Sequence, residues 1–482
     1  MIAALLAVPA LAGLAAFLIR GDRPRRALLA AAALLHAGLT LACWRTLPAP
    51  GGWLGLDAPG LLFLTIVSLL FLAAALYALD YLAREESGER VDFVGGGPFS
   101  NAPEARFTGC LLLFLATMTA VCVSRRFGLI WVATEATTLT SAPLIYYHRH
   151  HRSLEAAWKY LMLCSVGIAL ALLGNAFLAA AGPELTMDLD TLLAHAGALQ
   201  PVWLKGAFVL FLAGYGTKMG LAPMHSWLPD AHSESPSLVS ALLSGALLNC
   251  AFLGVLRGLQ VLSAAGLGDF ARGLLVPFGL LSMGVAAVFI QGQADYKRLL
   301  AYSSVEHMGI LALGVGLGGT GVFGAMLHAV NHSVVKALLF LCAGNILAAY
   351  KTKSAADARG VLRVLPWTGA LWLAGLLAAV GAPPFGPFVS EFAVLKAAAD
   401  QGRSFVVVAY LSCLTLVFVG MATTGLRMSL GPASRKVEAR ETPLSVAVPA
   451  ALALAALVLG VWVPPPLRRL LAQAARTLGG AG

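Results

Sequence analysis

The stretch GTKMGLAPMHSWLPDAHSESPS, residues 216–237, ends an apolar run that begins at Val202. Lys218 lies near the end of this run, and Pro223 and several polar side chains follow it. An ionisable side chain at membrane depth costs about 2.5–3.5 kcal/mol on insertion scales. If the run lies in lipid, Lys218 must therefore have a functional role or a specific partner.

The composition of the chain indicates that the run does lie in lipid. Of the 482 residues, 59% are hydrophobic and 12% are charged, and the mean hydropathy is +0.82, whereas soluble domains carry about 25% charged residues. A membrane-spanning helix needs roughly 20 apolar residues. We find fourteen such windows, which begin near Ile2, Ala27, Gly60, Phe107, Gly128, Ala157, Val202, Ser237, Arg272, Tyr296, Gly321, Trp367, Ser404 and Leu444. The pattern predicts an all-α polytopic membrane protein with about 14 transmembrane helices.

The net charge of +10 is distributed unevenly among the predicted loops. With both termini outside and the loops assigned alternately, the inside loops hold 19 arginines and lysines and the outside segments hold nine. Cytoplasmic loops of membrane proteins carry such an excess. The charge therefore predicts a multi-pass protein of the cell inner (cytoplasmic) membrane, with both termini outside, the lipid bilayer around it and no nucleic-acid partner.

Sequence signals for a cofactor are missing. None of the seven cysteines belongs to a Cys-x-x-Cys pair, which argues against thiolate binding of zinc or an iron–sulfur cluster. No glycine-rich phosphate loop or dinucleotide fingerprint follows a strand, and no flavin or quinone site is recognisable. We therefore expect no cofactor and no metal in this chain.

Ionisable residues recur inside the predicted helices. Glu135 lies about mid-span in the fifth helix, and Lys218 is similarly deep in the seventh, so opposite charges that face each other would be the least costly arrangement. The eleventh helix carries His328, His332 and Lys336 on one face, at spacings of i, i+4 and i+8. Glu391 lies in the twelfth helix. Such a series across consecutive helices favours a proton path over a single structural ion pair.

Other ionisable residues have simpler interpretations. Lys205 and Lys396 suit anchors at the membrane interface. Glu155 and Lys159 suit an ion pair at the start of the sixth helix. The two histidines of the eleventh helix have the spacing of hydrogen-bonded packing residues and also that of a zinc pair, but the sequence places no third ligand near them.

Two glycine–proline breaks suggest an internal repeat. One is Gly220–Pro223 and the other is Gly381–Pro384, and five helices separate them. Because five is odd, the two units would have opposite orientations, as in inverted repeats with broken helices at a midplane site. The predicted division is residues 1–106 (helices one to three and a polar loop), 107–262 (first five-helix repeat), 263–430 (second five-helix repeat) and 431–482 (last helix and a short basic tail).

The polar residues after the first break form a separate group. His225, Asp230 and His232 lie between Pro223 and Pro236, in a segment that connects the seventh and eighth helices at the inner side. This segment suits either proton uptake from the inside or docking of a neighbouring protein.

Three stretches carry a resemblance to a known family. KMGLAPMHSWLPDAHSESPSLVSALLSG (Lys218–Gly245), QADYKRLLAYSSVEHMG (Gln293–Gly309) and HAVNHSVVKALLFL (His328–Leu341) resemble the antiporter-like subunits of respiratory complex I, group 4 membrane-bound hydrogenases and Mrp-type antiporters. The resemblance covers roughly residues 60–430. Within that family, the chain is most similar to the F-type subunits of hydrogenase-4.

The resemblance implies a fold of fourteen helices with two inverted five-helix repeats. It implies a proton-translocating subunit that is not catalytic alone and belongs to a group 4 hydrogenase or a complex I-like oxidoreductase. The implied partners are other membrane subunits and a peripheral redox module, and the implied ion is the proton, with Na+ as the alternative. Glu135 and Lys218 would be the paired switch, Lys336 and the helix-eleven histidines the central relay, and Glu391 the exit group.

One residue departs from the family pattern. Several relatives have a lysine in the eighth helix where this chain has Asn249, and an amide does not take up a proton. Transfer from Lys218 to the eleventh helix would then need water. The alternatives are a stand-alone or Mrp-type cation/proton antiporter subunit and a subunit that is structural and non-conducting.

Overall fold

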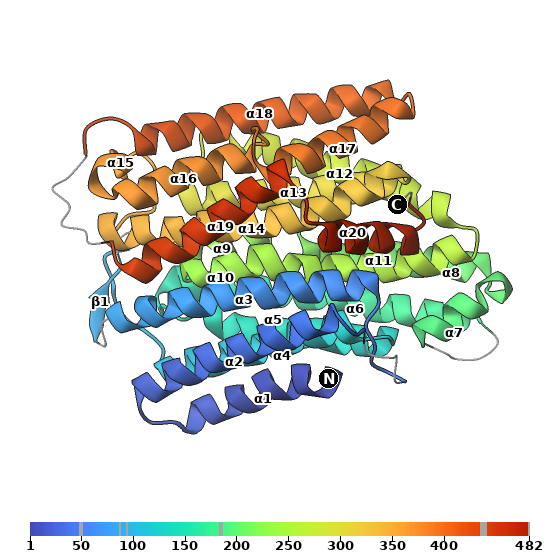
Figure 1. Ribbon diagram of the computed structural model, residues 1–482, viewed down its shortest axis with the longest axis horizontal. Helices are drawn as coiled ribbons and strands as arrows, with labels where there is room; N and C mark the ends of the chain where they lie inside the picture. Colours follow the sequence, from blue (N-terminus) through green and yellow to red (C-terminus); the bar gives the residue numbers. More distant parts are fainter. Residues whose placement is uncertain (48–51, 86–87, 93–94, 183–186, 434–440, 481–482) are drawn as a thin grey trace.

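The computed structural model describes residues 1–47, 52–85, 88–92, 95–182, 187–433 and 441–480. In this part of the chain, ten helices are long and apolar enough to cross a membrane. They run side by side along one common direction (Figure 1). The ten are α2 (Asp22–Cys43), α3 (Ala58–Arg84), α4 (Glu104–Val123), α6 (His151–Ala180), the continuous α10–η2–α11 (Ser237–Leu242, Leu243–Leu247, Leu248–Ala264), α12 (Gly268–Ile290), α13 (Tyr296–Leu317), α14 (Thr320–Tyr350), α18 (Ser404–Ser429) and α19 (Pro443–Val461). The predicted all-α polytopic class is confirmed.

The remaining elements complete this bundle. Two of them, α1 and α16, are shorter apolar helices. The others are α5, α8, α17, α20 and three short helices, with one 3₁₀ turn. Their bounds are α1 (Ile2–Leu18), α5 (Phe127–Ile145), α7 (Leu189–Ala194), η1 (Ala196–Ala198), α8 (Pro201–Met219), α9 (Trp227–Glu234), α15 (Val361–Val364), α16 (Pro366–Ala379), α17 (Gly386–Asp400) and α20 (Pro465–Thr477).

A small hairpin interrupts the helical pattern in the polar segment between α3 and α4. Strands β1 (Glu89–Val91) and β2 (Pro98–Ser100) pair antiparallel. Residues 86–87 and 93–94 of this segment lie outside the described residues, as do Arg435, Lys436 and Arg440 of the predicted inside loops. The hairpin lies at one end of the bundle, and α7 and both chain termini lie at the other (Figure 1). We call these the inner and the outer end, after the orientation that the charges predict.

The chain leaves the helical conformation at both predicted breaks. Helix α8 ends at Met219, and Gly220 adopts a left-handed backbone with φ of 82° before α9 begins at Trp227. Helix α16 ends at Ala379, and Gly381 has φ of 68° before α17 begins at Gly386. Glycine is required at both positions because other residues rarely adopt this backbone. Non-helical backbone therefore lies beside Lys218 and beside Glu391, in the interior of the bundle.

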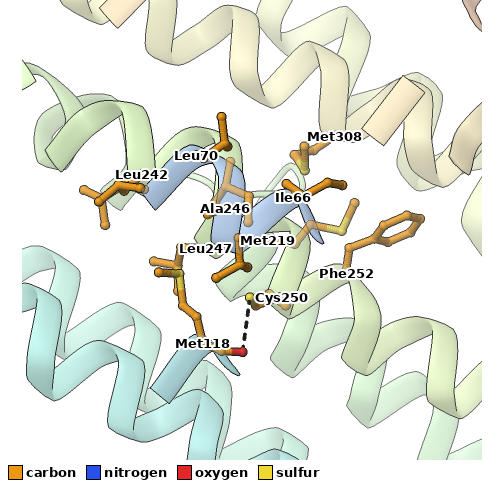
Figure 2. Close-up of a cluster of buried hydrophobic side chains, with 14 of the residues drawn as sticks. Ile66, Leu70, Met118, Met219, Leu242, Ala246, Leu247, Cys250, Phe252 and Met308 are labelled. Carbon is orange, nitrogen blue, oxygen red and sulfur yellow. Dashed lines mark hydrogen bonds between the residues drawn. The ribbon is translucent and has the colours of Figure 1, made fainter. Parts of the chain in front are cut away.

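The core surrounds the helix formed by α10, η2 and α11, whose apolar window is buried throughout. Figure 2 shows Ile66 and Leu70 of α3, Met118 of α4 and Met219 of α8 gathered around this helix. A π-helical turn such as η2 widens the helix locally and is frequently associated with a functional site. Gly245 in this turn lies so close to α14 that an added Cβ would be 3.0 Å from the Ser333 carbonyl oxygen. The core therefore brings the eighth and eleventh predicted helices into direct backbone contact.

The end of the chain differs from the sequence prediction of a short basic tail. Helix α19 ends at Val461, and the chain turns at Pro464 into the 13-residue helix α20. This helix packs against α3 and α14. The three consecutive prolines, Pro464–Pro466, follow the end of one helix and begin another, because proline is well tolerated in the first turn. Leucines along one side make this second helix amphipathic.

Candidate functional site

Lys218 is fully buried at the end of α8. Its ammonium nitrogen donates hydrogen bonds to Thr138 Oγ1 at 2.8 Å and to Tyr160 Oη at 2.6 Å. The same nitrogen lies 4.3 Å from the centre of the Tyr160 ring, a cation–π distance. Two hydroxyls and a ring therefore surround a cation that has no access to solvent.

Glu135 of α5 is half-buried, and it does not form an ion pair with Lys218 in the described part of the chain. Its carboxylate accepts a hydrogen bond from Ser165 Oγ at 2.7 Å and a long one from Thr138 Oγ1 at 3.5 Å. Thr138 thus accepts from Lys218 and donates to Glu135. The Lys218 ammonium and the Glu135 carboxylate are therefore bridged by the Thr138 hydroxyl and are not in direct contact.

A cluster of buried histidines lies between α13 and α14. His307 Nδ1 is 2.9 Å from His328 Nε2, and His328 Nδ1 is 3.0 Å from Ser390 Oγ of α17. The rings of His307 and His332 are 4.9 Å apart between centroids. Both His328 and His332 are predicted relay residues, and His307, for which the sequence predicts no role, joins them.

Lys336 lies two turns further along α14 and is also fully buried. Its ammonium donates to Ser303 Oγ at 2.6 Å and to the Leu300 carbonyl oxygen at 3.3 Å. His332 Nε2 is 3.2 Å from the carbonyl oxygen of Ser244 in η2. The predicted central relay therefore connects α14 to α13 on one side and to the π-helical turn on the other.

Two buried carboxyl groups complete this region. Glu391 lies against the α16–α17 break, where a Cβ added to Gly381 would overlap its Oε2. Ligand atoms of Glu391, His307 and His328 all lie within 4.8 Å of one another. The second carboxyl group belongs to Glu306, which precedes His307 on α13.

His307, His328 and Glu391 are residue types that bind divalent metals. However, the mutual contact of the two imidazoles and the Ser390 contact already engage Nδ1 of His307 and both nitrogens of His328. The arrangement in this structure is that of a hydrogen-bonded chain.

Several buried polar atoms of this region have no hydrogen-bond partner among the described residues. They are Glu306 Oε2, His307 Nε2, His332 Nδ1, Glu391 Oε1 and Asn249 Oδ1. Buried polar atoms are normally satisfied, and ordered water commonly supplies the missing contact. The polarity of the interior is therefore suited to bound water between the ionisable groups.

Asn249, where the resemblance implies a lysine, is fully buried in α11. Its amide nitrogen donates to the Gly245 carbonyl oxygen at 2.9 Å and to Ser333 Oγ at 2.7 Å. Ser333 Oγ in turn donates to the same Gly245 carbonyl oxygen at 2.7 Å. The amide thus ties the π-helical turn to α14.

The three polar residues after the first break have different surroundings. Asp230 pairs with Lys159 at 3.0 Å and with Arg298 at 2.7 Å, so it connects α9 to α6 and α13. His225 is half-buried, with its ring 6.3 Å from that of Tyr302. His232 is fully buried, and its ring is 5.7 Å from that of Phe340, one turn beyond Lys336.

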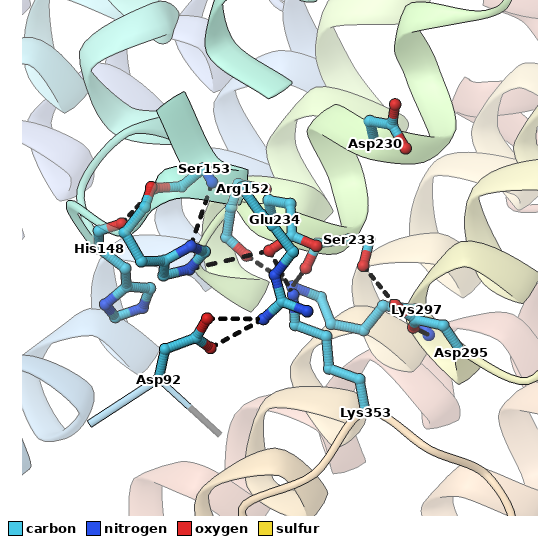
Figure 3. Close-up of polar contacts among 12 residues, drawn as sticks. Asp92, His148, Arg152, Ser153, Asp230, Ser233, Glu234, Asp295, Lys297 and Lys353 are labelled. Atoms are coloured by element: carbon cyan, nitrogen blue, oxygen red, sulfur yellow. Dashed lines mark hydrogen bonds and ion pairs between the residues drawn. The ribbon is translucent and has the colours of Figure 1, made fainter. Parts of the chain in front are cut away.

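A cavity of about 360 Å³ opens at the inner end, near α9. Lys353 pairs with Glu234 at 2.7 Å, and the buried Lys297 donates to the carbonyl oxygens of Ser233 and Ser235 (Figure 3). Burial acts to raise the pKa of Glu234, but the nearby Lys353 ammonium lowers it below its usual range. Glu234 therefore stays charged at neutral pH in the wall of this cavity.

A second ionic cluster closes the outer end. Asp57, at the start of α3, pairs with Arg125 at 2.8 Å and with the fully buried Arg257 of α11, and Arg125 also pairs with Asp190. Burial acts to raise the pKa of Asp57, but the two guanidinium groups hold it well below its usual range. The cluster joins the start of α3 to α7, to α11 and to the turn between α4 and α5.

The simpler interpretations of other charges match their positions. Lys205 is exposed, with its nitrogen 5.3 Å from the ring centre of Phe270. Lys396 and Asp400 form an exposed pair, and Lys159 pairs with Glu155 at 2.6 Å as well as with Asp230.

Comparison with known proteins identifies the family. The family model described as "NADH:quinone oxidoreductase/Mrp antiporter, TM" matches residues 124–417. The hydrogenase-4 component F homolog of Methylacidiphilum infernorum (isolate V4) is 38% identical over 360 residues, which are 72% of this chain and 73% of that protein.

Two solved structures share the fold. A chain of respiratory complex I from Thermus thermophilus aligns with a TM-score of 0.82 at 26% identity and covers 100% of both chains. A chain of the archaeal membrane-bound sulfane sulfur reductase complex aligns with a TM-score of 0.88 at 22% identity, over 99% of this chain and 98% of that one. The protein is thus a multi-span integral membrane protein of the NADH:quinone oxidoreductase/Mrp antiporter family, related in sequence to hydrogenase-4 components.

Proposed function

We propose that this chain is a proton-translocating, antiporter-like membrane subunit of a redox-driven complex, a group 4 hydrogenase or a complex I-like oxidoreductase. The observation that carries the proposal is the series of buried and half-buried ionisable side chains across consecutive helices, in a chain of this family. The series runs from Glu135 and Lys218 through His332, His328 and Lys336 to Glu391. We add His307 and Glu306, because they lie within the same cluster. The chain contributes the path and no redox cofactor.

The proposed architecture has fourteen transmembrane helices. To the ten long spans we add α1, α5, α8 and the broken helix made of α16 and α17. Residues 107–262 and 263–430 would be two inverted five-helix repeats, flanked by residues 1–106 and 431–482. The positions of the two breaks support this division, because each lies beside one buried ionisable group.

The proposed switch uses the Thr138 bridge. When Lys218 and Glu135 are close, the carboxylate favours the protonated lysine. Movement driven by a partner subunit would separate them, and the buried ammonium would then release its proton. Because Asn249 does not titrate, the proton would cross to His332 and His328 through water, for which the unpartnered buried atoms provide contacts.

We propose the inner cavity as the route of proton uptake. It is lined by Lys297 and by Glu234 of α9, and the same helix carries the fully buried His232. His232 also has an unpartnered Nε2 among the described residues, which suits it to pass a proton toward Lys336. Asp230 and His225 would shape the approach, and Asp230 would also hold α9 in place. The transported ion is the proton, with Na+ as the alternative.

A non-conducting structural subunit is the second candidate, and Asn249 favours it. The Asn249 amide nitrogen donates one hydrogen bond to Gly245 of η2 and one to Ser333 of α14, so both hydrogens are engaged in structural contacts. In that case, the fold would be retained for assembly with other membrane subunits and the peripheral redox module. A stand-alone or Mrp-type cation/proton antiporter is distinguished by ion exchange after reconstitution of this chain alone.

Substitution of Lys218 tests the proton-carrier role. Arginine keeps the charge but does not release its proton, since its pKa exceeds 12. Lys218→Arg should therefore abolish proton transport while the complex still assembles, and Lys218→Ala should abolish it as well. The measurement is the proton-to-electron ratio in vesicles, normalised to assembled complex.

The control for this experiment is Lys205→Arg, which changes an exposed lysine of the same helix and should retain the wild-type ratio. A structural ion pair predicts another order, with arginine tolerated and alanine destabilising by about 3–5 kcal/mol. Full transport by Lys218→Arg would end the proton-carrier proposal.

A further inference from the structure

A second cavity, of about 290 Å³, lies at the outer end of the bundle. Its wall is formed by the beginning of α12, by residues 316–319 where α13 ends and α14 begins, and by Arg403 just before α18. Gly479, which follows α20, completes the wall. Segments that are distant in the sequence therefore meet around one opening, at the end of the bundle where both chain termini lie (Figure 1).

Two arginines from different segments line this cavity, and neither is well paired. Arg403 is exposed, and its side chain has no hydrogen bond or ion pair within the described residues. Arg272 of α12 makes only long contacts, at 3.4 Å to Asp269 and at 3.4 Å to the Gly479 carbonyl oxygen. Its Nε is buried without a hydrogen-bond partner among the described residues. Because each guanidinium group carries five N–H donors, most of the donors in this wall are unused.

Glycines leave open space beside the two guanidinium groups. Gly318 has φ of 70°, and a Cβ added there would lie 3.4 Å from Arg272 Nε, so the turn can approach the arginine closely. Gly273 and Gly319 also line the cavity, and neither has any atom within 4 Å of an added Cβ. A side chain at either position would project into empty space. The wall therefore combines cationic donors with room for a ligand.

The charge of the lining favours an anion. Asp269 is the one carboxylate among the lining residues that the structure describes. Its side chain is fully exposed, and an exposed pair such as its 3.4 Å contact with Arg272 contributes little stability. Two guanidinium groups against one carboxylate leave a positive excess. Arginine binds phosphate oxygens through two parallel hydrogen bonds, which makes phosphate the anion that this donor set fits best.

We propose that this cavity binds the phosphate of a phospholipid headgroup from the outer leaflet. Lipid phosphates lie at the level of the headgroups, where the helices of the bundle begin and end. Phe405 and Val408 follow Arg403 in α18, on one side of that helix, and are 78% and 63% exposed. They offer an apolar surface for the acyl chains directly below the charges. Free phosphate has the same oxygens but no chains to place there.

A bound headgroup would hold the outer ends of α12 and α18 and the turn between α13 and α14 against one another. This site is separate from the proposed proton path, and it requires only that the outer end of the bundle meet a lipid surface. Its test is equilibrium binding, which does not depend on proton transport, so that failure of one proposal leaves the other standing.

The first experiment titrates the purified, delipidated complex that contains the full chain with radiolabelled dioctanoyl phosphatidylglycerol. R272Q/R403Q should weaken binding at one site per copy of this chain by at least about tenfold, because hydrogen bonds between charged groups are lost. R272K/R403K should weaken it by less than about threefold, because the charge remains. The matched control is R45Q, which removes an exposed arginine just after α2 at the outer end and should bind as the wild type does.

The melting temperature of each complex checks that the variants fold, and sites on other subunits contribute equally to all of them. Asp269→Asn provides a test of opposite sign, since it removes the negative charge and leaves both arginines in place. It should bind the lipid at least as tightly as the wild type. Wild-type binding by R272Q/R403Q, or weaker binding by Asp269→Asn, would overturn the proposal.

Two further probes distinguish the source of the phosphate. Dioctanoylglycerol, which has the chains without the phosphate, should not displace the labelled lipid, and inorganic phosphate should displace it only weakly. Displacement by dioctanoylglycerol as effective as that by unlabelled lipid would overturn the role of the arginines. Inorganic phosphate that binds the wild type as tightly as the lipid does, but not R272Q/R403Q, would overturn the lipid assignment in favour of a free anion.

Discussion

Among single residues, Thr138 has the most direct influence on the proposed switch. Its hydroxyl accepts from Lys218 at 2.8 Å and donates to Glu135 at 3.5 Å. Valine has nearly the same shape but neither donates nor accepts, and loss of a hydrogen bond to a charged group costs about 1.5–3 kcal/mol. Replacement of Thr138 by valine therefore removes the hydrogen bonds with little change in packing.

Thr138→Val should lower proton transport per assembled complex by at least about tenfold, because about 1.4 kcal/mol corresponds to a factor of ten. Thr138→Ser keeps the hydroxyl and should stay within about threefold of the wild type. Both variants are measured as proton-to-electron ratio in vesicles. Wild-type transport by the valine variant would show that Lys218 and Glu135 communicate by another route.

The depth of the charged residues was predictable from the sequence, but their hydroxyl partners were not. In the sequence, Lys218 lies far from the start of its apolar run, and the Gly220–Pro223 pattern marks where the helix stops. Helices that are apolar on all sides give no signal for which side faces a neighbour. Tyr160 and Ser303 bind the two relay lysines from other helices, and serine, threonine and tyrosine recur along those helices. Only the packing singles out these hydroxyls.

At the scale of elements, the α16–α17 break places a left-handed glycine beside a buried carboxyl group. Gly381 has φ of 68°, and a Cβ there would overlap Glu391 Oε2. Gly402, in the turn before α18, has a similar φ of 66° but no atom within 4 Å of its added Cβ. The two glycines therefore share the backbone cost of substitution but not the contact.

Gly381→Ala should displace the Glu391 side chain and lower proton transport strongly, whereas Gly402→Ala should retain it. Both should lose about 1 kcal/mol of stability, because alanine is unfavourable at positive φ. Melting temperature in detergent and transport per assembled complex are the two measurements. Equal transport by both variants would argue against a role for the position of Glu391.

The outer ionic cluster, formed by Asp57, Arg125, Asp190 and Arg257, holds several helices together by ion pairs. Asp57→Asn leaves the buried Arg257 without its carboxylate, and breaking a buried pair in this way costs about 3–5 kcal/mol. Because the pKa of Asp57 is lowered in the folded protein, its stabilisation is present above the unfolded value, near about 4, and is lost as the pH falls below it.

The expected result is a lower melting temperature for Asp57→Asn at about pH 7 and a smaller change between about pH 5 and pH 3 than in the wild type. Asp269→Asn is the control, since the Asp269 side chain is fully exposed and pairs with Arg272 at only 3.4 Å. A melting temperature of Asp57→Asn equal to that of the control would show that the cluster does not brace the fold.

At the scale of the whole molecule, the distribution of arginine and lysine predicts the orientation, and the structure places both termini at the same end (Figure 1). A reporter fused after Gly482 should therefore appear outside, and one inserted at Ala433, between α18 and α19, should appear inside. Phosphatase and fluorescent-protein fusions measure these locations. Two reporters on the same side would contradict fourteen crossings.

The class of the protein followed from composition because lipid imposes one rule on every spanning segment. Features of individual helices could not be predicted from composition. The π-helical turn η2 contains Gly245, which lies against Ser333, but many of these helices contain glycine and the sequence does not single this one out. The sequence predicts a short basic tail after the last helix, but the prolines that end α19 also begin α20, so that the tail is helical. Local patterns predict where a helix ends, but not that another begins there.

The hydroxyl of Thr138 has one hydrogen, and this has a kinetic consequence. A proton that passes from Glu135 through this hydroxyl to Lys218 leaves the O–H bond pointing back toward Glu135, as it does in the structure. The next hop in the same direction is then blocked until the side chain rotates about its Cβ–Oγ1 bond. Each transfer therefore requires one rotation of this hydroxyl before a second proton can follow by the same route.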